Sequence, residues 1–282
     1  MIVDFHCHTF PDKIAAATLE FLSGKSHSVY YTDGTTDGLS ASMQKAGADQ
    51  SVNLPVITKA GQARKVNHGL YLRREELEKQ GIISFAGIHP ENENWKEELK
   101  LIKEEGFVGL KLHPSYQGVD LNDIRYLRII EEASALDLII TVHCGIDLGI
   151  LGHNYASVDH ILQVLQEAKP AKLVCAHMGN WDCWDQVESD LCGAPVWFDT
   201  AFSLGEVRPK PGTQIPPYRL RTLENEDFVR ICRKHGTDRI LFGTDSPWED
   251  QAEDIRKIRE SGLTAEECDA VLGDNAERLL KL

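Results

Sequence analysis

The sequence predicts an α/β fold, a closed (β/α)8 TIM barrel that forms a single domain over residues 1–282. Eight apolar runs of strand length recur along the chain, and segments with helical periodicity lie between them. The runs are almost continuously hydrophobic, as is typical of parallel strands buried on both faces. A chain of 282 residues also suits this barrel, which needs about 250 residues. An open doubly wound sheet is the alternative, but no glycine-rich nucleotide-binding motif follows any of the runs.

The predicted strands each end in polar residues or in Gly or Pro, and their ranges are 2–8, 50–56, 82–90, 107–114, 138–145, 172–179, 195–202 and 239–246. Helical patterns with charged outer faces are clearest over 97–105, 124–136, 158–169 and 224–235. Two connections exceed the usual length in a compact domain, so long loops are predicted at 9–49 and 203–222. Such loops often form lids or contact a substrate.

The composition is that of a globular protein and disfavours several classes of function. Asp and Glu total 44 against 30 Lys and Arg, and the formal net charge of −14 argues against a nucleic-acid-binding surface. The seven Cys include no Cys-X-X-Cys pair, so neither a disulfide framework nor a zinc finger is predicted. The sequence also has no signal pattern and no run of about 18 apolar residues. We therefore expect a cytoplasmic protein without a membrane partner.

The first predicted strand ends in a His-X-His pair. His6 and His8 are two residues apart, so their side chains share one face of an extended strand and can hold one metal ion. A single His-X-His motif more often faces solvent or is hydrogen-bonded in the core than binds a metal. Here, however, residue types that can bind a metal recur at later strand ends, where barrels place their reactive groups. These residues are His89, His113, His143, His177 and Asp245, with Lys111 on the same face as His113. Six of the 11 His lie at predicted strand ends, which random placement would not produce.

Imidazoles with one carboxylate suit a divalent ion. We expect His6, His8, His143 and Asp245 to bind one ion, with Zn²⁺ as the expected metal and Mn²⁺, Fe²⁺ or Co²⁺ as alternatives. His177 would then face the open side of the ion. Because such an ion lowers the pKa of its water to about 7, a hydroxide nucleophile becomes available. Asp245 and His177 are the predicted catalytic residues.

The motifs around these residues resemble the amidohydrolase superfamily. The resemblance rests on Gly-Leu-Lys-Leu-His-Pro (109–114), Val-His-Cys-Gly (142–145), Ala-His-Met-Gly (176–179) and Phe-Gly-Thr-Asp-Ser-Pro (242–247). These motifs are most similar to the amidohydrolase-related branch that includes aminocarboxymuconate semialdehyde decarboxylase. The resemblance spans almost the whole chain and implies the same four ligands, with His177 as acid/base. The branch contains hydrolases, decarboxylases and hydratases, so the resemblance leaves the reaction open.

Lys111 raises an alternative, because binuclear members of the wider superfamily use a carbamylated lysine on the fourth strand. A second ion would then be bound by Lys111 and His177, with His143. We favour an unmodified Lys111 that binds a substrate carboxylate, with His113 lining the mouth. His89 is expected in the pocket or in a turn, and Trp248 is expected to stack on a planar substrate. TatD-like nucleases share the opening motif, but they carry an acidic residue in place of Lys111.

The sequence therefore predicts a metal-dependent hydrolase that activates a water to cleave a C–N or C–O bond in a small molecule. The alternative is a metal-dependent nonoxidative decarboxylase, a C–C lyase that acts on a planar carboxylic acid. A non-enzymatic metal-binding protein is the third reading, and a spare His177 beside the ion argues against it. Barrels of this kind often dimerise, so the prediction is compatible with a homodimer.

Overall fold

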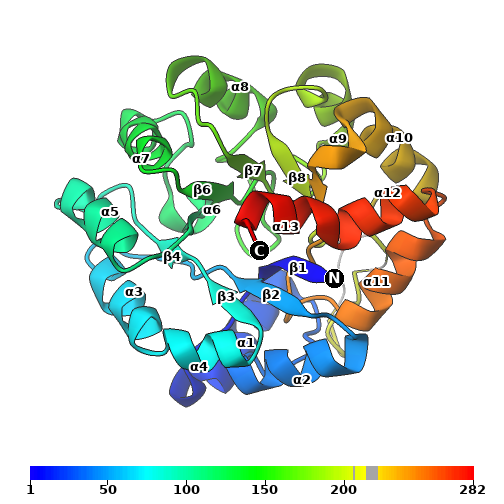
Figure 1. Cartoon of the computed structure of the whole chain (residues 1–282), viewed down its shortest axis with the longest axis horizontal. Helices are drawn as coiled ribbons and strands as arrows, with labels where there is room; N and C mark the ends of the chain where they lie inside the picture. Colours follow the sequence, from blue (N-terminus) through cyan, green and yellow to red (C-terminus); the bar gives the residue numbers. More distant parts are fainter. Residues whose placement is uncertain (206, 214–221) are drawn as a thin grey trace. The chain divides into compact units, whose positions relative to one another are not determined.

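The computed structural model describes residues 1–205, 207–213 and 222–282 (Figure 1). The chain divides into two compact units, which we describe separately. The first unit comprises Met1–Asn53, Gln80–Ile82 and Asp199–Leu282, and the second comprises Leu54–Lys79 and Ile83–Phe198. The long loop predicted at 203–222 lies partly outside the described residues, at 206 and 214–221.

The first unit is built around β1 (Val3–Cys7), which is fully buried and pairs in parallel with β2 (Gln50–Asn53). The chain that follows β9 (Ile240–Leu241) lies along the other edge of β1, where the Phe5 amide donates to the Phe242 carbonyl at 2.7 Å. The helices of this unit are α1 (Asp12–Ser26), α2 (Thr36–Ala46), α10 (Asn225–His235), α11 (Gln251–Glu260), α12 (Ala265–Asp269) and α13 (Asn275–Leu280), with single turns at Thr237–Arg239 and Ala270–Asp274.

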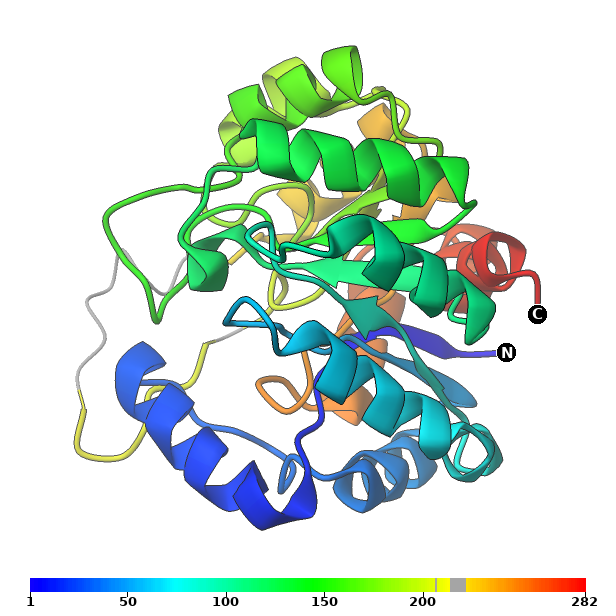
Figure 2. The same cartoon turned by 90° about the vertical axis from the view of Figure 1, so that its left-hand side faces the viewer.

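The two ends of the chain lie side by side in the first unit (Figures 1 and 2). The Met1 ammonium is 3.6 Å from Glu277 Oε1 on α13. The first strand of the chain therefore packs with elements from its last 50 or so residues, and the His-X-His pair lies next to these elements.

The second unit contains parallel strands in the order β4 (Ala86–Gly87), β5 (Gly109–Leu112), β6 (Ile139–Val142), β7 (Leu173–Cys175) and β8 (Trp197–Asp199), the last residue of β8 belonging to the first unit. Lys111 lies opposite Thr141, and Val142 lies opposite Cys175, so the ends of these strands are in register. The helices of this unit are α3 (Ala63–Leu72), α4 (Arg74–Lys79), α5 (Trp95–Glu104), α6 (Pro114–Gln117), α7 (Ile124–Ala135), α8 (Val158–Glu167) and α9 (Trp184–Gln186), with a further turn at Val187–Leu191.

Each of the eight predicted strand ranges contains a strand, and the third contains two, β3 (Ile82–Ser84) and β4, which Phe85 separates. The four predicted helices correspond to α5, α7, α8 and α10, and their bounds agree within about two residues. Side-chain caps begin two of them, because Asp123 accepts from the Arg125 amide and Ser157 from the His160 amide. In the parts of the chain that the structure describes, no helix is both long and apolar enough to cross a membrane.

The connection 9–49, predicted as a long loop, instead contains α1 and α2. The sequence pattern is hard to recognise because α1 buries only Ala15, Leu19 and Ser23, a narrow stripe of mostly small residues four positions apart. A cap marks the start of α2, where Thr35 Oγ1 accepts from the Gly38 amide at 3.0 Å.

Candidate metal centre and active site

Three of the four predicted metal ligands meet in the first unit. His6 Nε2 lies 3.2 Å from His8 Nε2, and Asp245 Oδ1 lies 3.0 Å from His8 Nε2 and 3.2 Å from His6 Nε2. His6 is fully buried, whereas the side chains of His8 and Asp245 keep 11% and 15% of their exposure. The cluster is therefore anchored in the core and reachable from one side.

The spacing of these three atoms fits a divalent metal ion. Such ions bind nitrogen and oxygen at about 2.0–2.2 Å, and tetrahedral or octahedral geometry then separates neighbouring ligand atoms by about 3.0–3.4 Å. The observed separations of 3.0–3.2 Å lie within that range. Two imidazoles and one carboxylate also form a donor set that zinc, manganese and iron accept. The residues present therefore fit a metal ion.

Strand pairing places these ligands. The extended conformation of β1 points His6 and His8 to one face, and the Asp245 amide donates to the His6 carbonyl at 2.8 Å. Gly243 permits this close approach, because a Cβ at that position would lie 2.8 Å from the Cβ of His6. Asp245 itself has a left-handed backbone conformation, with φ at 60°, which only surrounding structure can hold in a non-glycine residue.

Asp199, at the end of β8, orients His6. Its Oδ2 lies 2.8 Å from His6 Nδ1, and both side chains are fully buried. A carboxylate on Nδ1 favours the tautomer that leaves Nε2 as an electron-pair donor for a metal. Sequence reasoning missed this residue, although it lies in the predicted strand 195–202 and is the only acidic side chain there.

A second buried carboxyl group, Asp4, fixes the strand that carries the histidines. Its oxygens accept from the Thr244 amide at 3.0 Å, the Thr244 hydroxyl at 2.6 Å and Gln251 Nε2 at 2.8 Å. Burial raises the pKa of Asp4, while these hydrogen bonds oppose the rise. Asp4 thus ties β1 to the segment that holds Asp245.

Four of the predicted site residues lie together at strand ends of the second unit. His177 Nε2 is 2.9 Å from His143 Nδ1, and the rings of His143 and His113 stack with centroids 4.2 Å apart. Lys111, on β5, is buried with them, at 1% exposure. Asp147 is an addition that the sequence did not predict, and its Oδ2 lies 3.7 Å from His113 Nε2 and 3.8 Å from His143 Nε2. It follows the strand in a loop, where strand periodicity gives no signal.

The other predicted site residues have clear local roles. His89 forms a turn, since its Nδ1 accepts from the Glu91 amide at 3.1 Å, and burial lowers the pKa of His89. Trp248 closes a turn that begins at Asp245, because its amide donates to the Asp245 carbonyl at 3.0 Å. His143 belongs to the second unit and His6, His8 and Asp245 to the first, so the four-residue ligand set remains a prediction.

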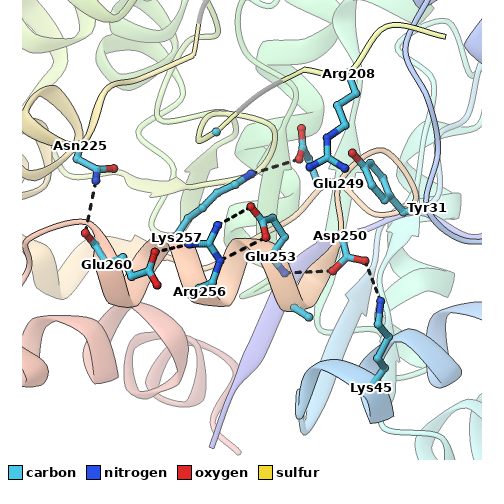
Figure 3. Close-up of a pocket in the computed structure, with 12 residues that line it drawn as sticks. Tyr31, Lys45, Arg208, Asn225, Glu249, Asp250, Glu253, Arg256, Lys257 and Glu260 are labelled. Atoms are coloured by element: carbon cyan, nitrogen blue, oxygen red, sulfur yellow. Dashed lines mark hydrogen bonds and ion pairs between the residues drawn. The ribbon is translucent and has the colours of Figure 1, made fainter. Parts of the chain in front are cut away.

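A buried charge cluster lies beyond Asp245 along the chain (Figure 3). Lys257 Nζ donates to Asp254 Oδ1 at 2.9 Å and to the Leu204 carbonyl at 3.1 Å, and it lies 3.6 Å from Glu249 Oε2. Burial, with help from Asp254, raises the pKa of Glu249 to about 9. Burial likewise raises the pKa of Asp254 to about 7, against the opposing effect of Lys257.

These shifts predict a protein that loses stability as the pH rises. Each carboxyl group binds its proton more tightly in the folded state, so its stabilising effect is complete below its unfolded pKa and is lost as the pH passes its folded pKa. For Glu249 this window runs from 4.5 to about 9. We expect the free energy of unfolding in urea to fall over this window in the wild type and to fall less in Glu249→Gln. Glu260→Gln, at an exposed position of α11, is the control, and parallel curves for all three proteins would contradict the prediction.

Comparisons with known proteins agree with this geometry. The family described as Amidohydrolase matches residues 3–282. No curated protein matches the chain. Solved structures do match over nearly their whole length, and the parallel alternation of strands and helices agrees with them, so the predicted (β/α)8 barrel class and the resemblance are confirmed.

Three of the similar structures illustrate the range of reactions. A 2,6-dihydroxybenzoate decarboxylase bound to 2,6-dihydroxybenzoate is 17% identical, with a TM-score of 0.68, covering 100% of this chain and 99% of its own. A candidate 2-pyrone-4,6-dicarboxylic acid hydrolase from Pseudomonas putida is 15% identical, with a TM-score of 0.66, covering 99% and 97%. A dihydroxybenzoic acid decarboxylase from Polaromonas, with bound manganese and an inhibitor, is 15% identical, with a TM-score of 0.68, covering 100% and 97%. The chain therefore belongs to the amidohydrolase family and is a metal-dependent enzyme of that superfamily.

Proposed function

We propose that the protein is a metal-dependent hydrolase that cleaves a C–N or C–O bond in a small molecule. The observation that carries this proposal is the cluster of His6, His8 and Asp245, whose spacing suits one divalent ion and in which His8 and Asp245 keep partial exposure. We propose Zn²⁺ as the ion and His143 as the fourth ligand, following the resemblance of the motifs. When bound, such an ion lowers the pKa of a coordinated water to about 7 and polarises a substrate oxygen.

The chain's own residues would transfer protons, orient the proposed ligands and bind the substrate. Asp245 retains partial exposure, so it can accept the proton of the attacking water, and Asp199 keeps His6 in the tautomer that binds metal. His177 shares a hydrogen bond with His143, which can relay a proton to the leaving group. Lys111, at 1% exposure on β5, is proposed to pair with a substrate carboxylate, following the resemblance of the motifs.

Substrate contacts and cellular setting complete the proposal. We propose that His113 and His89 line the pocket and that Trp248 stacks on a planar substrate. A second ion bound by Lys111 and His177 remains the alternative to an unmodified lysine. We propose that the protein is cytoplasmic, acts on a small molecule and binds no nucleic acid. This proposal is compatible with a homodimer.

Nonoxidative decarboxylation of a planar carboxylic acid is the second candidate. It is favoured by the likeness to the two dihydroxybenzoate decarboxylases, one of which was crystallised with manganese. The histidines would serve here as well, because a decarboxylase needs an acid to protonate carbon where the carboxylate leaves. The difference between the reactions lies in whether water enters the product.

A substrate panel in ¹⁸O-labelled water separates the two reactions. We expect lactones, amides and pyrone carboxylates to give products that carry ¹⁸O, detected by mass spectrometry, without release of CO2. Product that carries no label and forms together with CO2 from dihydroxybenzoates would replace the hydrolase with the decarboxylase. His8→Ala serves as the blank, because it removes a proposed metal ligand.

Asp199→Asn tests the orientation of His6. An asparagine keeps the size of the side chain but loses its charge, so the tautomer of His6 is less well fixed. We expect metal affinity to fall by about ten- to a hundredfold, as is typical for loss of a partner behind a metal ligand. Competition with a chelator measures that affinity. Asp190→Asn, on another segment, is the control, and equal affinity in both variants would contradict the assigned role.

A further inference from the structure

The first unit contains a cavity of 720 Å³ that lies along α11, beneath the segment that follows β8 (Figure 3). Its volume is within the range of small-molecule sites, roughly 300–1,000 Å³. The cavity walls include none of His6, His8 and Asp245, so it is separate from the candidate metal centre. Neither the proposed reaction nor the family resemblance assigns it a role.

Most charges in its wall are already compensated. Three of the four cations that line the cavity form ion pairs: Lys45 with Asp250 at 3.3 Å, Arg256 with Glu253 at 2.7 Å and also with Glu260, and Lys257 with Asp254 at 2.9 Å. Arg256 has two carboxylate partners and the other two cations have one each, so none of the three carries uncompensated positive charge.

Arg208 is the fourth cation, and it differs from the others. Its guanidinium lies over the ring of Tyr31, 5.9 Å from the ring centroid, and it points toward Tyr31 and Glu249 in the cavity (Figure 3). Within residues 1–205, 207–213 and 222–282, the structure gives this guanidinium no carboxylate partner. The planar donor edge of an arginine matches a carboxylate with two parallel hydrogen bonds.

Glu249 does not oppose an anion near Arg208. Burial raises the pKa of Glu249 to about 9, which favours the protonated carboxyl group at neutral pH, and that form can donate a hydrogen bond to an anion. The charged groups near Glu249 are Lys257 and Asp254 on α11, Asp245 in its own segment, and Arg208 from the segment after β8. Among the described residues that line the cavity, Arg208 is the cation without a carboxylate partner.

We propose that this cavity binds a small organic monocarboxylate, with the Arg208 guanidinium paired to the carboxylate beside the Glu249 carboxyl group. A single negative charge matches the single unpartnered cation. A phosphate, with up to two charges, would need more than the one cation that Arg208 offers, because the other three cations of the wall are already paired. The site stands on the cavity and its charges alone, so it does not depend on the proposed reaction.

Calorimetric titration with benzoate tests the site at neutral pH in four proteins: the wild type, Arg208→Gln, Arg128→Gln and His8→Ala. Arg128→Gln is the matched control, an exposed arginine on α7 of the second unit. We expect Arg208→Gln to weaken benzoate binding at least about tenfold, the cost of a charge-assisted pair, and Arg128→Gln to leave it unchanged. Binding should persist in His8→Ala, which separates this site from the metal centre. Benzamide, neutral and of similar shape, and inorganic phosphate should bind more weakly.

The proposal is overturned by any of three results. These are an absence of benzoate binding to the wild type at millimolar concentration, equal affinities in Arg208→Gln and Arg128→Gln, and loss of binding in His8→Ala alone. Arg208→Lys guards against a folding defect in Arg208→Gln. It keeps the charge but loses the planar donor edge, so an intermediate affinity supports the site. Failure of this test leaves the metal content unaffected, so it is distinguishable from failure of the proposed function.

Discussion

Replacing His8 with alanine is expected to empty the metal centre and to lower kcat/KM by at least about a hundredfold. This loss is larger than that expected for a residue such as Asp199, which only hydrogen-bonds a proposed ligand. His8 Nε2 is 3.2 Å from His6 Nε2 and 3.0 Å from Asp245 Oδ1, so its removal leaves two of the three clustered donors. Elemental analysis of purified protein measures the metal stoichiometry, and Asp245→Ala should give the same result.

His153→Ala is the control for this prediction. His153 is half exposed and pairs with Asp120 in the second unit, and it is not among the predicted ligands, so its loss should leave the metal content unchanged. Circular dichroism establishes that His8→Ala is folded. Retention of metal at full stoichiometry in both His8→Ala and Asp245→Ala would refute the assigned ligands.

Gly145→Ala should destabilise the protein strongly. Gly145 follows β6 and adopts φ of 98°, and a Cβ there would lie 2.2 Å from the amide nitrogen of Trp181. That amide donates to the Cys144 carbonyl at 3.0 Å, so the substitution must separate two segments, one after His143 and one after His177. Backbone cannot yield as a flexible side chain does, and we expect a loss of at least about 3 kcal/mol in the free energy of unfolding.

Gly152→Ala provides the matched control. Gly152 has nearly the same backbone angle, φ of 99°, but nothing lies within 4 Å of the Cβ it would gain. The difference between the two variants in chemical denaturation therefore isolates the contact with Trp181, and we expect it to exceed about 2 kcal/mol. Equal losses would mean that the backbone angle alone determines the cost.

The strands and the clustering of His6, His8 and Asp245 were predictable from sequence because short-range rules determine them. The alternation of a strand places His6 and His8 on one face, and the common direction of parallel strands brings Asp245 to the same end. The helices at 12–26 and 36–46 were not predicted; the buried stripe of α1 contains a single large apolar residue, Leu19, between Ala15 and Ser23, and so does not stand out from an exposed segment.

The residues that orient the histidines could not be predicted by the same rules. Asp199 was hidden within an apolar strand, and its role depends on a 2.8 Å contact with a residue 193 positions away. Asp147 lies in a loop, where no periodicity indicates the direction of a side chain. Such positioning contacts depend on tertiary packing, so sequence alone predicts which side chains are chemically suitable but not which of them support one another.

The separation of the ligands along the chain bears on how the enzyme is made. His6 and His8 leave the ribosome well before Asp245, which lies 237 positions after His8. At about 5–20 residues per second, β1 therefore waits for at least some ten seconds before the segment after β9 arrives to pair with it. A nascent chain has no complete ligand cluster throughout this time. We therefore expect metal loading to follow synthesis of Asp245, and chains that terminate before Asp245 to lack the complete cluster.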